Sequence, residues 1–233
     1  MKEEILILSL DDHRCLDPSL VGFKAANLAR ALREGFPVPP GFCLTTSASR
    51  LLRESGGSFP QALREEVSRA LRSLPPGRLA VRSSATVEDS SSFSFAGQAS
   101  TFLDVEPENL EEAILNCVAS LDNPQARSYR AFHNLPAGEM AILIQLMVPA
   151  DKAGVAFTRD PVTGEEVVVI EAVRGFGEAL VSGQAQPERY RVKGMTPESG
   201  GEILSPGEVQ AVAGMALALE RIFGCPQDVE WCC

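Results

Sequence analysis

The stretch LAVRSSATVEDSSSFSFAGQASTFLDV, residues 79–105, carries the strongest signal for both fold and function. Its first three residues are apolar and predict a short strand that holds Arg82 at the edge of a sheet. Small hydroxyl and acidic residues follow, and the β-rich Thr101-Phe102-Leu103 then predicts a second strand, so the segment between forms an anchored loop. Backbone N–H groups and hydroxyls can form an anion-binding concavity, and a planar guanidinium grips phosphate oxygens in pairs. The pattern suggests a nucleoside triphosphate as ligand, whereas loop composition alone is more typical of a solvated serine-rich loop with a salt-bridged Arg82.

Composition limits the classes of partner. With 233 residues and 45% hydrophobic residues, the chain can bury a sizeable core. Its formal net charge of −10 argues against a nucleic-acid partner, because phosphate backbones are held by basic surfaces. No apolar run reaches the roughly 20 residues of a membrane span, and the N-terminus MKEEILILSL reads as a first strand rather than a signal peptide. The expectation is a cytoplasmic protein that binds no membrane, with six cysteines that are reduced and packed.

Four other stretches extend the argument beyond residues 81–103. They are VGFKAANLARALREGFPVPPGF at 21–42, QLMVPADKAGVAFTRDPVTGE at 145–165, IEAVRGFGEALVSG at 170–183 and QDVEW at 227–231. Together these segments resemble the N-terminal nucleotide-binding domain of phosphoenolpyruvate synthase, which pyruvate phosphate dikinase and rifampicin phosphotransferase share. The resemblance covers nearly the whole chain. It implies an α+β, ATP-grasp fold over residues 1–233, with lobes of roughly residues 1–105 and 106–233.

Lys24 is expected in the first turn of a helix over residues 23–33 that Gly35 ends. A cation at a helix N-terminus opposes the macrodipole, and a solvated surface lysine is the alternative interpretation. The resemblance implies that Lys24, in GFKAANL, reaches the triphosphate. Phe23 departs from the family pattern, which has a second glycine there. The proline-rich segment 36–42 then forms a rigid link into a strand at 43–46.

The remaining segments alternate helices and strands. Helices are expected at residues 47–54, 60–74, 107–120 and 124–133, followed by a strand at 140–148 that is apolar on both faces. A hairpin with a Pro/Gly turn is expected over residues 152–171, and a glycine-hinged helix around 175–183. A Rossmann site is rejected because no G-x-G-x-x-G follows a strand in a βαβ frame. The resemblance places adenine beside Gln145 and the backbone of residues 146–148, whereas their side chains are equally consistent with plain core.

The last segment predicts a helix and then a strand. Ser205-Pro206-Gly207-Glu208 is a capping-box signature for a helix through Phe223 that Gly224 ends. Asp228 and Glu230 are two residues apart on the strand that follows, so they share a face. Paired carboxylates suit Mg²⁺ that bridges phosphates, and an ordinary acidic strand is the alternative. The family's D-x-E pattern favours Glu230 as the metal ligand.

The resemblance implies a function for the whole set. It assigns ATP binding to Lys24, Arg82, Gly97, Thr101, Gln145 and Glu230, catalytic neutralisation of phosphate charge to Lys24 and Arg82, and Mg²⁺ to Glu230 and Asp228. The expected activity is transfer of a phosphoryl group from ATP, via a phosphohistidine on a swivelling domain in cis or in trans, to pyruvate on an acceptor domain. Two alternatives stay open: the ATP domain of a rifampicin-type phosphotransferase, and a truncated, non-catalytic nucleotide-binding module. The family pattern includes a further Q-x-R-P strand that this sequence does not contain, so the domain is expected to be C-terminally incomplete and inactive alone in the full reaction.

Overall fold

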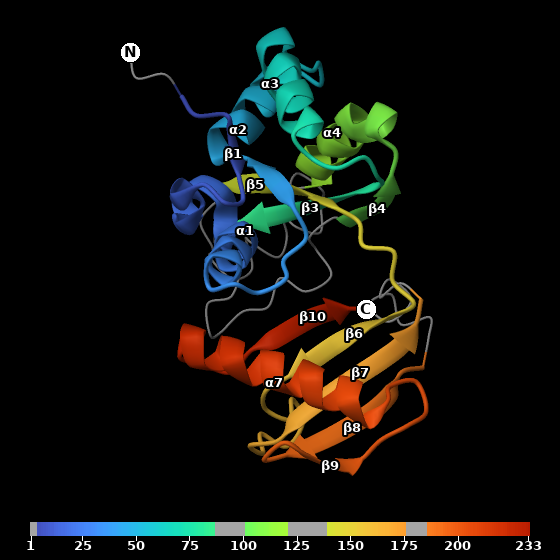
Figure 1. Ribbon diagram of the computed structural model, residues 1–233. Coiled ribbons are helices and arrows are strands. Elements are labelled where there is room, and N and C mark those ends of the chain that lie inside the picture. The colour runs from blue at the N-terminus through green and yellow to red at the C-terminus, as the bar shows by residue number, and fades with distance from the viewer. Residues whose placement is uncertain (1–3, 87–100, 121–138, 176–185) are drawn as a thin grey trace. The chain divides into compact units, whose positions relative to one another are not determined.

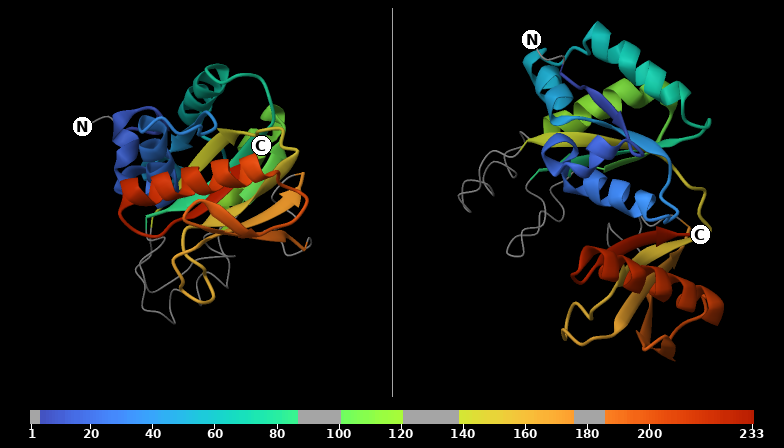
Figure 2. Two further views of the ribbon diagram at one scale, coloured as in Figure 1. Left: turned by 60° about the horizontal axis from the view of Figure 1, so that its bottom comes forward. Right: turned by 60° about the vertical axis from the view of Figure 1, so that its left-hand side comes forward.

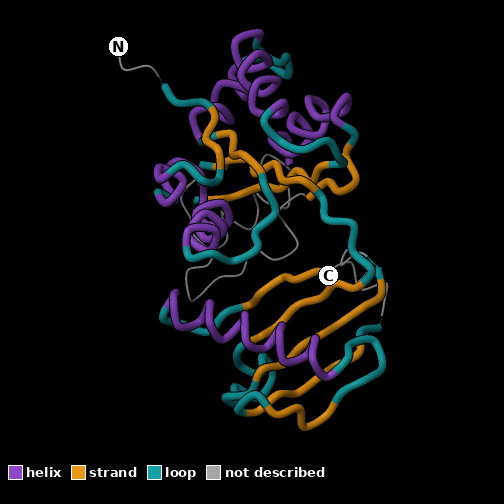
Figure 3. Tube along the Cα trace, in the orientation of Figure 1, coloured by secondary structure: helices purple, strands orange, loops and turns teal. Residues whose placement is uncertain are grey.

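The computed structural model describes residues 4–86, 101–120, 139–175 and 186–233, and these form two compact units. The first unit is Met1–Met147 and the second is Val148–Cys233. The lobe boundary expected after residue 105 lies inside the first unit, because the strands before and after it belong to one sheet. In each unit strands are backed by helices (Figure 3), which makes the chain a mixed α and β protein.

The first unit is built on an antiparallel sheet with strand order β1-β2-β5-β3-β4 (Figure 1). Its strands are β1 (Ile7–Ser9), β2 (Gly41–Leu44), β3 (Leu79–Ala85), β4 (Thr101–Val105) and β5 (Met140–Leu146). The central β5 is buried on both faces, as its apolar sequence predicts. Every neighbouring pair in this order is antiparallel.

Helices cover both faces of this first sheet (Figure 1). They are α1 (Pro18–Arg33), α2 (Thr46–Glu54), α3 (Gln61–Arg72) and α4 (Leu110–Ser120), with short 3-10 turns η1 (His13–Leu16) and η2 (Pro107–Asn109). One face packs Val81, Ile142 and Ile144 against α2, α3 and α4. The other face packs Leu143 and its neighbours against the small residues of α1. The two cores lie on opposite sides because alternate residues of a strand face opposite ways.

The ends of β3 and β2 in the first unit differ from expectation. The strand expected to end at Val81 continues through Ala85, pairing with β5 along its whole length and with β4 on its other side. Arg82 is therefore inside the sheet rather than at its edge. The small side chains of Ser83 and Ser84 permit this, since both are buried under the helices. The strand expected at 43–46 ends at Leu44 because the Thr45 hydroxyl accepts from the Ala48 N–H (3.3 Å) and so caps α2.

The second unit is an antiparallel sheet of order β10-β6-β7-β8-β9, with helix α7 packed on one face (Figure 2). Its elements are β6 (Lys152–Phe157), β7 (Val168–Arg174), β8 (Glu188–Lys193), β9 (Thr196–Ser199), α7 (Pro206–Phe223) and β10 (Asp228–Cys232). The predicted hairpin is β6–β7. The predicted capping box at Ser205 and the left-handed Gly224 bound α7. The sequence patterns had not predicted β8 or β9.

Some of the expected features lie outside the described residues. The helices expected at 124–133 and around 175–183 fall mainly there, as does Gly97. Within the described ranges, no helix is long and apolar enough to cross a membrane. All six cysteines are free. Three of them are buried as expected, whereas Cys225, Cys232 and Cys233 are exposed.

Candidate nucleotide-binding site

Three of the predicted site residues share one face of the first sheet. Arg82 of β3 lies opposite Thr101 of β4 and Leu143 of β5. Gln145, two residues along β5 from Leu143, lies on the same face, because residues in register share a face and so do alternate residues of a strand. Leu143 packs in the core beneath α1, so this is the face that α1 covers. Arg82, Thr101 and Gln145 thus lie on the sheet face that is covered by α1, and α1 is the helix that carries Lys24.

Helix α1 begins anew immediately before Lys24. Gly22 has φ 72° and ψ 167°, which breaks the helix and leaves Lys24 in the first turn of the segment that follows. The Ala25 N–H donates to the Ser84 hydroxyl (3.1 Å), so the new first turn is bonded to β3. Lys24 is partly exposed. Burial raises the pKa of the Cys117 thiol in α4 to about 12, and the positive charge of Lys24 acts in the opposite direction on that pKa. The expected first-turn position of Lys24 therefore has a physical origin in the break at Gly22.

Gln145 is 6% exposed and is fixed by its surroundings. Its side-chain Nε2 donates to the Pro39 carbonyl (3.1 Å), so the amide is oriented by the proline-rich link. The Leu146 N–H donates to Pro40 (2.9 Å) and the Met147 N–H to Arg78 (2.8 Å). The backbone N–H groups of Leu146 and Met147, which lie beside the expected adenine position, therefore already donate hydrogen bonds to other residues of the first unit.

The hydroxyls at the end of β3 are not placed for direct contact with a phosphate. Ser83 and Ser84 are 2% and 0% exposed, respectively. Ser83 faces the α2–α4 side, and the Ser84 hydroxyl is engaged by α1. The prediction that these two hydroxyls line an anion-binding concavity is therefore wrong. The serines that follow lie outside the described residues.

In the second unit, Asp228 and Glu230 are both exposed on one face of β10, as the spacing predicted. The ladder pairs Glu230 with Val155, Val155 with Glu171 and Glu171 with Arg189, so these four form one row across the sheet. No group of three or more His, Cys, Asp or Glu side chains suited to a metal occurs among the described residues. One or two carboxylates are nevertheless what Mg²⁺ needs when a nucleotide supplies other ligands. Asp228 and Glu230 fit a cation of that kind.

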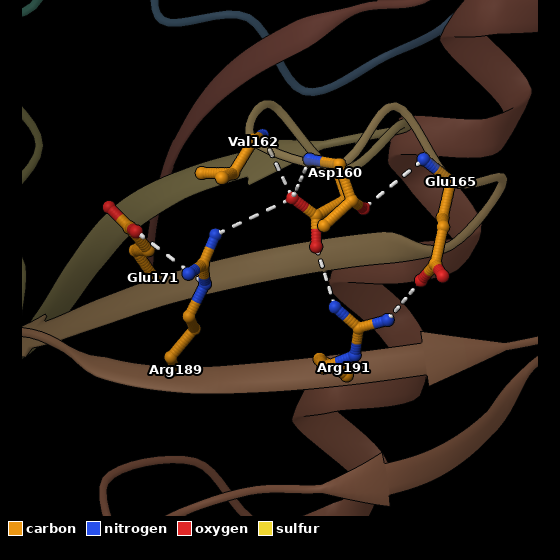
Figure 4. Close-up of polar contacts among 7 residues, drawn as sticks. Asp160, Val162, Glu165, Glu171, Arg189 and Arg191 are labelled. Carbon is orange, nitrogen blue, oxygen red and sulfur yellow. Dashed lines mark hydrogen bonds and ion pairs between the residues drawn. The ribbon is translucent and has the colours of Figure 1, made fainter.

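A charge network centred on the buried Asp160 lies beside this row (Figure 4). Asp160, 3% exposed, accepts from the backbone N–H groups of Val162 (2.9 Å) and Thr163 (3.2 Å) and from the Arg191 guanidinium (2.5 Å). The backbone donors are the main reason that the pKa of Asp160 is lowered. Arg191 also donates to Glu165 (2.7 Å). The network ties the β6–β7 turn to β8.

Sequence reasoning missed this network although a signal was present. Asp followed by Pro and then Thr-Gly is typical of a turn in which the Asp side chain accepts local N–H groups. The arginine on β8 could not be foreseen because that strand was itself unpredicted. Ser84 was noted only as part of a polar run; its spacing of two from Arg82 is the signal that places both on one face.

The family of the chain is shown by its similarity to known proteins. Residues 54–206 match the family described as pyruvate phosphate dikinase, AMP/ATP-binding domain, so the chain belongs to this family. Arg82, Gly97, Thr101 and Gln145 lie within the matched range, whereas Lys24, Asp228 and Glu230 lie outside it.

Individual relatives extend the similarity to both ends of the chain. The chain is 32% identical to a phosphoenolpyruvate synthase from Aeropyrum pernix, covering 98% of this chain and 40% of the relative. It is 31% identical to the prodigiosin synthesizing transferase PigC of Serratia marcescens, over 97% of this chain and 31% of the relative. It is 31% identical to a rifampicin phosphotransferase from Bacillus cereus, over 91% of this chain and 32% of the relative. The chain thus spans less than half the length of these relatives.

Proposed function

We propose that this chain is the ATP-binding part of a phosphotransferase, of ATP-grasp type, that passes a phosphoryl group from ATP to pyruvate through a phosphohistidine on another domain. One observation carries the proposal: Arg82, Thr101 and Gln145 share the sheet face that α1 covers, and α1 carries Lys24. All four match nucleotide-site positions of the family that the sequence resembles. The family assignment supports ATP as the ligand.

The proposed mechanism is electrostatic. Lys24 and Arg82 neutralise the triphosphate, and they require little reorganisation because their backbones are fixed in α1 and β3. Gln145, held by Pro39, orients the base. Asp228 and Glu230 would hold Mg²⁺, which supplies further neutralisation of phosphate charge when bound. The transfer itself then needs a nucleophile from elsewhere, for which a phosphohistidine domain is the proposed partner.

The identity of the final phosphoryl acceptor is the most specific part of the proposal. The relatives bear the names of a synthase, an antibiotic phosphotransferase and a pigment-forming transferase, so chains with different names share this domain. A rifampicin-type acceptor and a non-catalytic nucleotide-binding role are therefore the competing assignments. We retain pyruvate because several of the relatives are named phosphoenolpyruvate synthase.

Calorimetry with Mg-ATP tests the nucleotide site. The wild type should bind, and Arg82→Ala should weaken binding about tenfold or more, since one charge-assisted contact contributes about 1.5–3 kcal/mol. Arg64→Ala is the matched control: it removes a guanidinium of the same unit, on α3, that pairs with Glu111 of α4 at the surface. Equal losses for the two variants would remove Arg82 from the site, and no binding by the wild type would overturn the proposed function.

A further inference from the structure

A buried hydrogen bond joins the two segments that carry the proposed phosphate-binding cations. The Ser84 hydroxyl accepts from the Ala25 N–H at 3.1 Å, across 59 residues of sequence. Both residues are completely buried. The donor is one of the first N–H groups after the helix break, a group that has no partner within its own helix. Ser84 therefore caps the segment of α1 that begins at Phe23.

A second contact joins the same two segments on the other side of Lys24. A Cβ on Gly22 would lie 2.1 Å from the Ser84 carbonyl oxygen, closer than any side chain tolerates. The φ of 72° at Gly22 is also one that other residues adopt only with strain. Backbone therefore lies directly against backbone at this point. Lys24 stands between two residues, Gly22 and Ala25, that both contact Ser84.

Ser84 also has a fixed relation to Arg82. The two residues are alternate positions of β3 and face the same side of the sheet. One residue thus holds the backbone of Lys24 in register with the backbone of Arg82. Ser84 itself is fully buried and its hydroxyl is engaged by α1, so it is not placed for direct contact with a nucleotide.

We propose that Ser84 is a positioning residue that sets the separation of Lys24 and Arg82 and thereby makes the site selective for a polyphosphate over the bare nucleoside. The inference rests on the proposed ATP-binding function and adds to it a residue outside the set assigned by the family resemblance. Small displacements of charged groups matter because an ionic contact depends steeply on geometry. A purely structural cap would stabilise the fold without distinguishing phosphate from base.

The first experiment compares Mg-ATP with adenosine, which shares the base and ribose and lacks the phosphates. Ser84→Ala should weaken Mg-ATP binding about tenfold and change adenosine binding less than about twofold. Ser83→Ala is the matched control, because Ser83 is the next residue, is also buried, and faces the opposite side of the sheet. It should leave both affinities within about twofold of the wild type.

A double-mutant cycle with Lys24→Ala shows whether Ser84 acts through Lys24. In the Lys24→Ala background, Ser84→Ala should weaken Mg-ATP binding by less than about twofold, because the group that it positions is gone. Independent, multiplicative losses would overturn the proposal, as would parallel losses of Mg-ATP and adenosine. If Ser84→Ala does not fold, Ser84→Cys keeps an atom at the γ position that is a poor acceptor and should show the same selectivity loss. Wild-type protein that binds no Mg-ATP would overturn the proposed function, whereas wild-type binding unchanged by Ser84→Ala would overturn only the role of Ser84.

Discussion

The two units place their polar residues in opposite ways. In the first unit, helices cover both faces of the sheet, and the buried side chains of Ser84 and Gln145 each make a neutral hydrogen bond to the backbone. In the second unit, one helix covers one face, and charged side chains form cross-strand rows on the other. Burial between two layers demands small or neutral groups, because an unpaired buried charge is costly. Beneath α1, the first unit therefore positions the proposed charges through its backbone, whereas the second unit holds charges by direct ion pairing on the sheet face opposite α7.

The largest expected effect is a loss of stability on truncating a core isoleucine, and it should be confined to the unit that carries the substitution. Ile142 and Ile170 are both fully buried, one in each sheet, and replacing either with alanine should cost about 2–5 kcal/mol of its unit's stability. Trp231, the one tryptophan of the chain, packs in the second unit's core. In urea unfolding, Ile170→Ala should move the tryptophan fluorescence transition, and Ile142→Ala should move the far-UV circular dichroism transition without it.

Each variant serves as the control for the other. The two substitutions remove the same atoms from equally buried positions, so any difference between the two signals reflects the unit rather than the chemistry. A tryptophan transition that moves equally in both variants would show that the units unfold as one cooperative body, and the comparison would then fail.

The sequence predicted the second unit's α7 more closely than the first unit's β3. The capping box at Ser205 and the glycine at 224 are local signals, and each appears in the structure as expected. The end of β3 is decided by strands and helices distant in sequence, which bury Ser83 and Ser84 although their composition favours a loop. Tertiary pairing overrides local propensity at such positions.

The same distinction holds for the site. The spacing of Asp228 and Glu230 fixes their common face from the sequence alone, and the structure agrees. The shared face of Arg82 and Gln145 depends on the register of β3 against β5, which no single segment encodes. Family resemblance supplied these residues, and only the ladder shows how they come together. Their assignment to nucleotide remains a prediction that binding measurements must test.

A somewhat smaller loss of stability is expected when alanine replaces a glycine that lies against the backbone of a neighbouring strand. A Cβ on Gly154 would lie 1.8 Å from the Glu171 carbonyl oxygen and 2.7 Å from the Trp231 ring. Gly154→Ala should cost about 1–3 kcal/mol through strand displacement and should shift the native tryptophan emission. Gly41→Ala is the matched change in the first unit, where a Cβ would lie 2.3 Å from the Ile144 carbonyl oxygen. It should destabilise without altering that emission; an unchanged emission in Gly154→Ala would contradict a contact between the added methyl group and the indole ring.

A glycine in open space should behave in the opposite way. Gly207 lies in the first turn of α7, and a Cβ there would meet nothing within 4 Å. Gly207→Ala should stabilise the second unit by about 0.5 kcal/mol, because alanine restricts the unfolded chain more than glycine does. The urea midpoint of tryptophan fluorescence should therefore rise in Gly207→Ala. A lower midpoint would show that the cap at Ser205 requires the glycine.

The smallest expected effect is the pH dependence of stability that comes from one ion-paired carboxylate in each unit. The hydrogen bond from Lys152 (2.6 Å), with further bonds from Ser205, lowers the pKa of Glu208 from 4.5 to about 2. Because the folded-state pKa is lowered, the ionised carboxylate stabilises the fold in full above about pH 4.5, and this contribution disappears as pH falls toward about 2. In the first unit, the side chain of Arg14 likewise lowers the pKa of Asp12 to about 2.

Glu208→Gln should therefore lower the second unit's urea midpoint at about pH 6 and converge with the wild type toward about pH 3. Screening by solvent keeps the effect modest, since both partners are partly exposed. Asp12→Asn is the matched control: its difference from the wild type should also shrink on acidification, but in the dichroism transition rather than in tryptophan fluorescence. A Glu208→Gln deficit that stays constant from about pH 6 to about pH 3 would mean that the side chain stabilises α7 by its shape and neutral hydrogen bonds, and the contrast between backbone positioning and ion pairing would lose its support in the second unit.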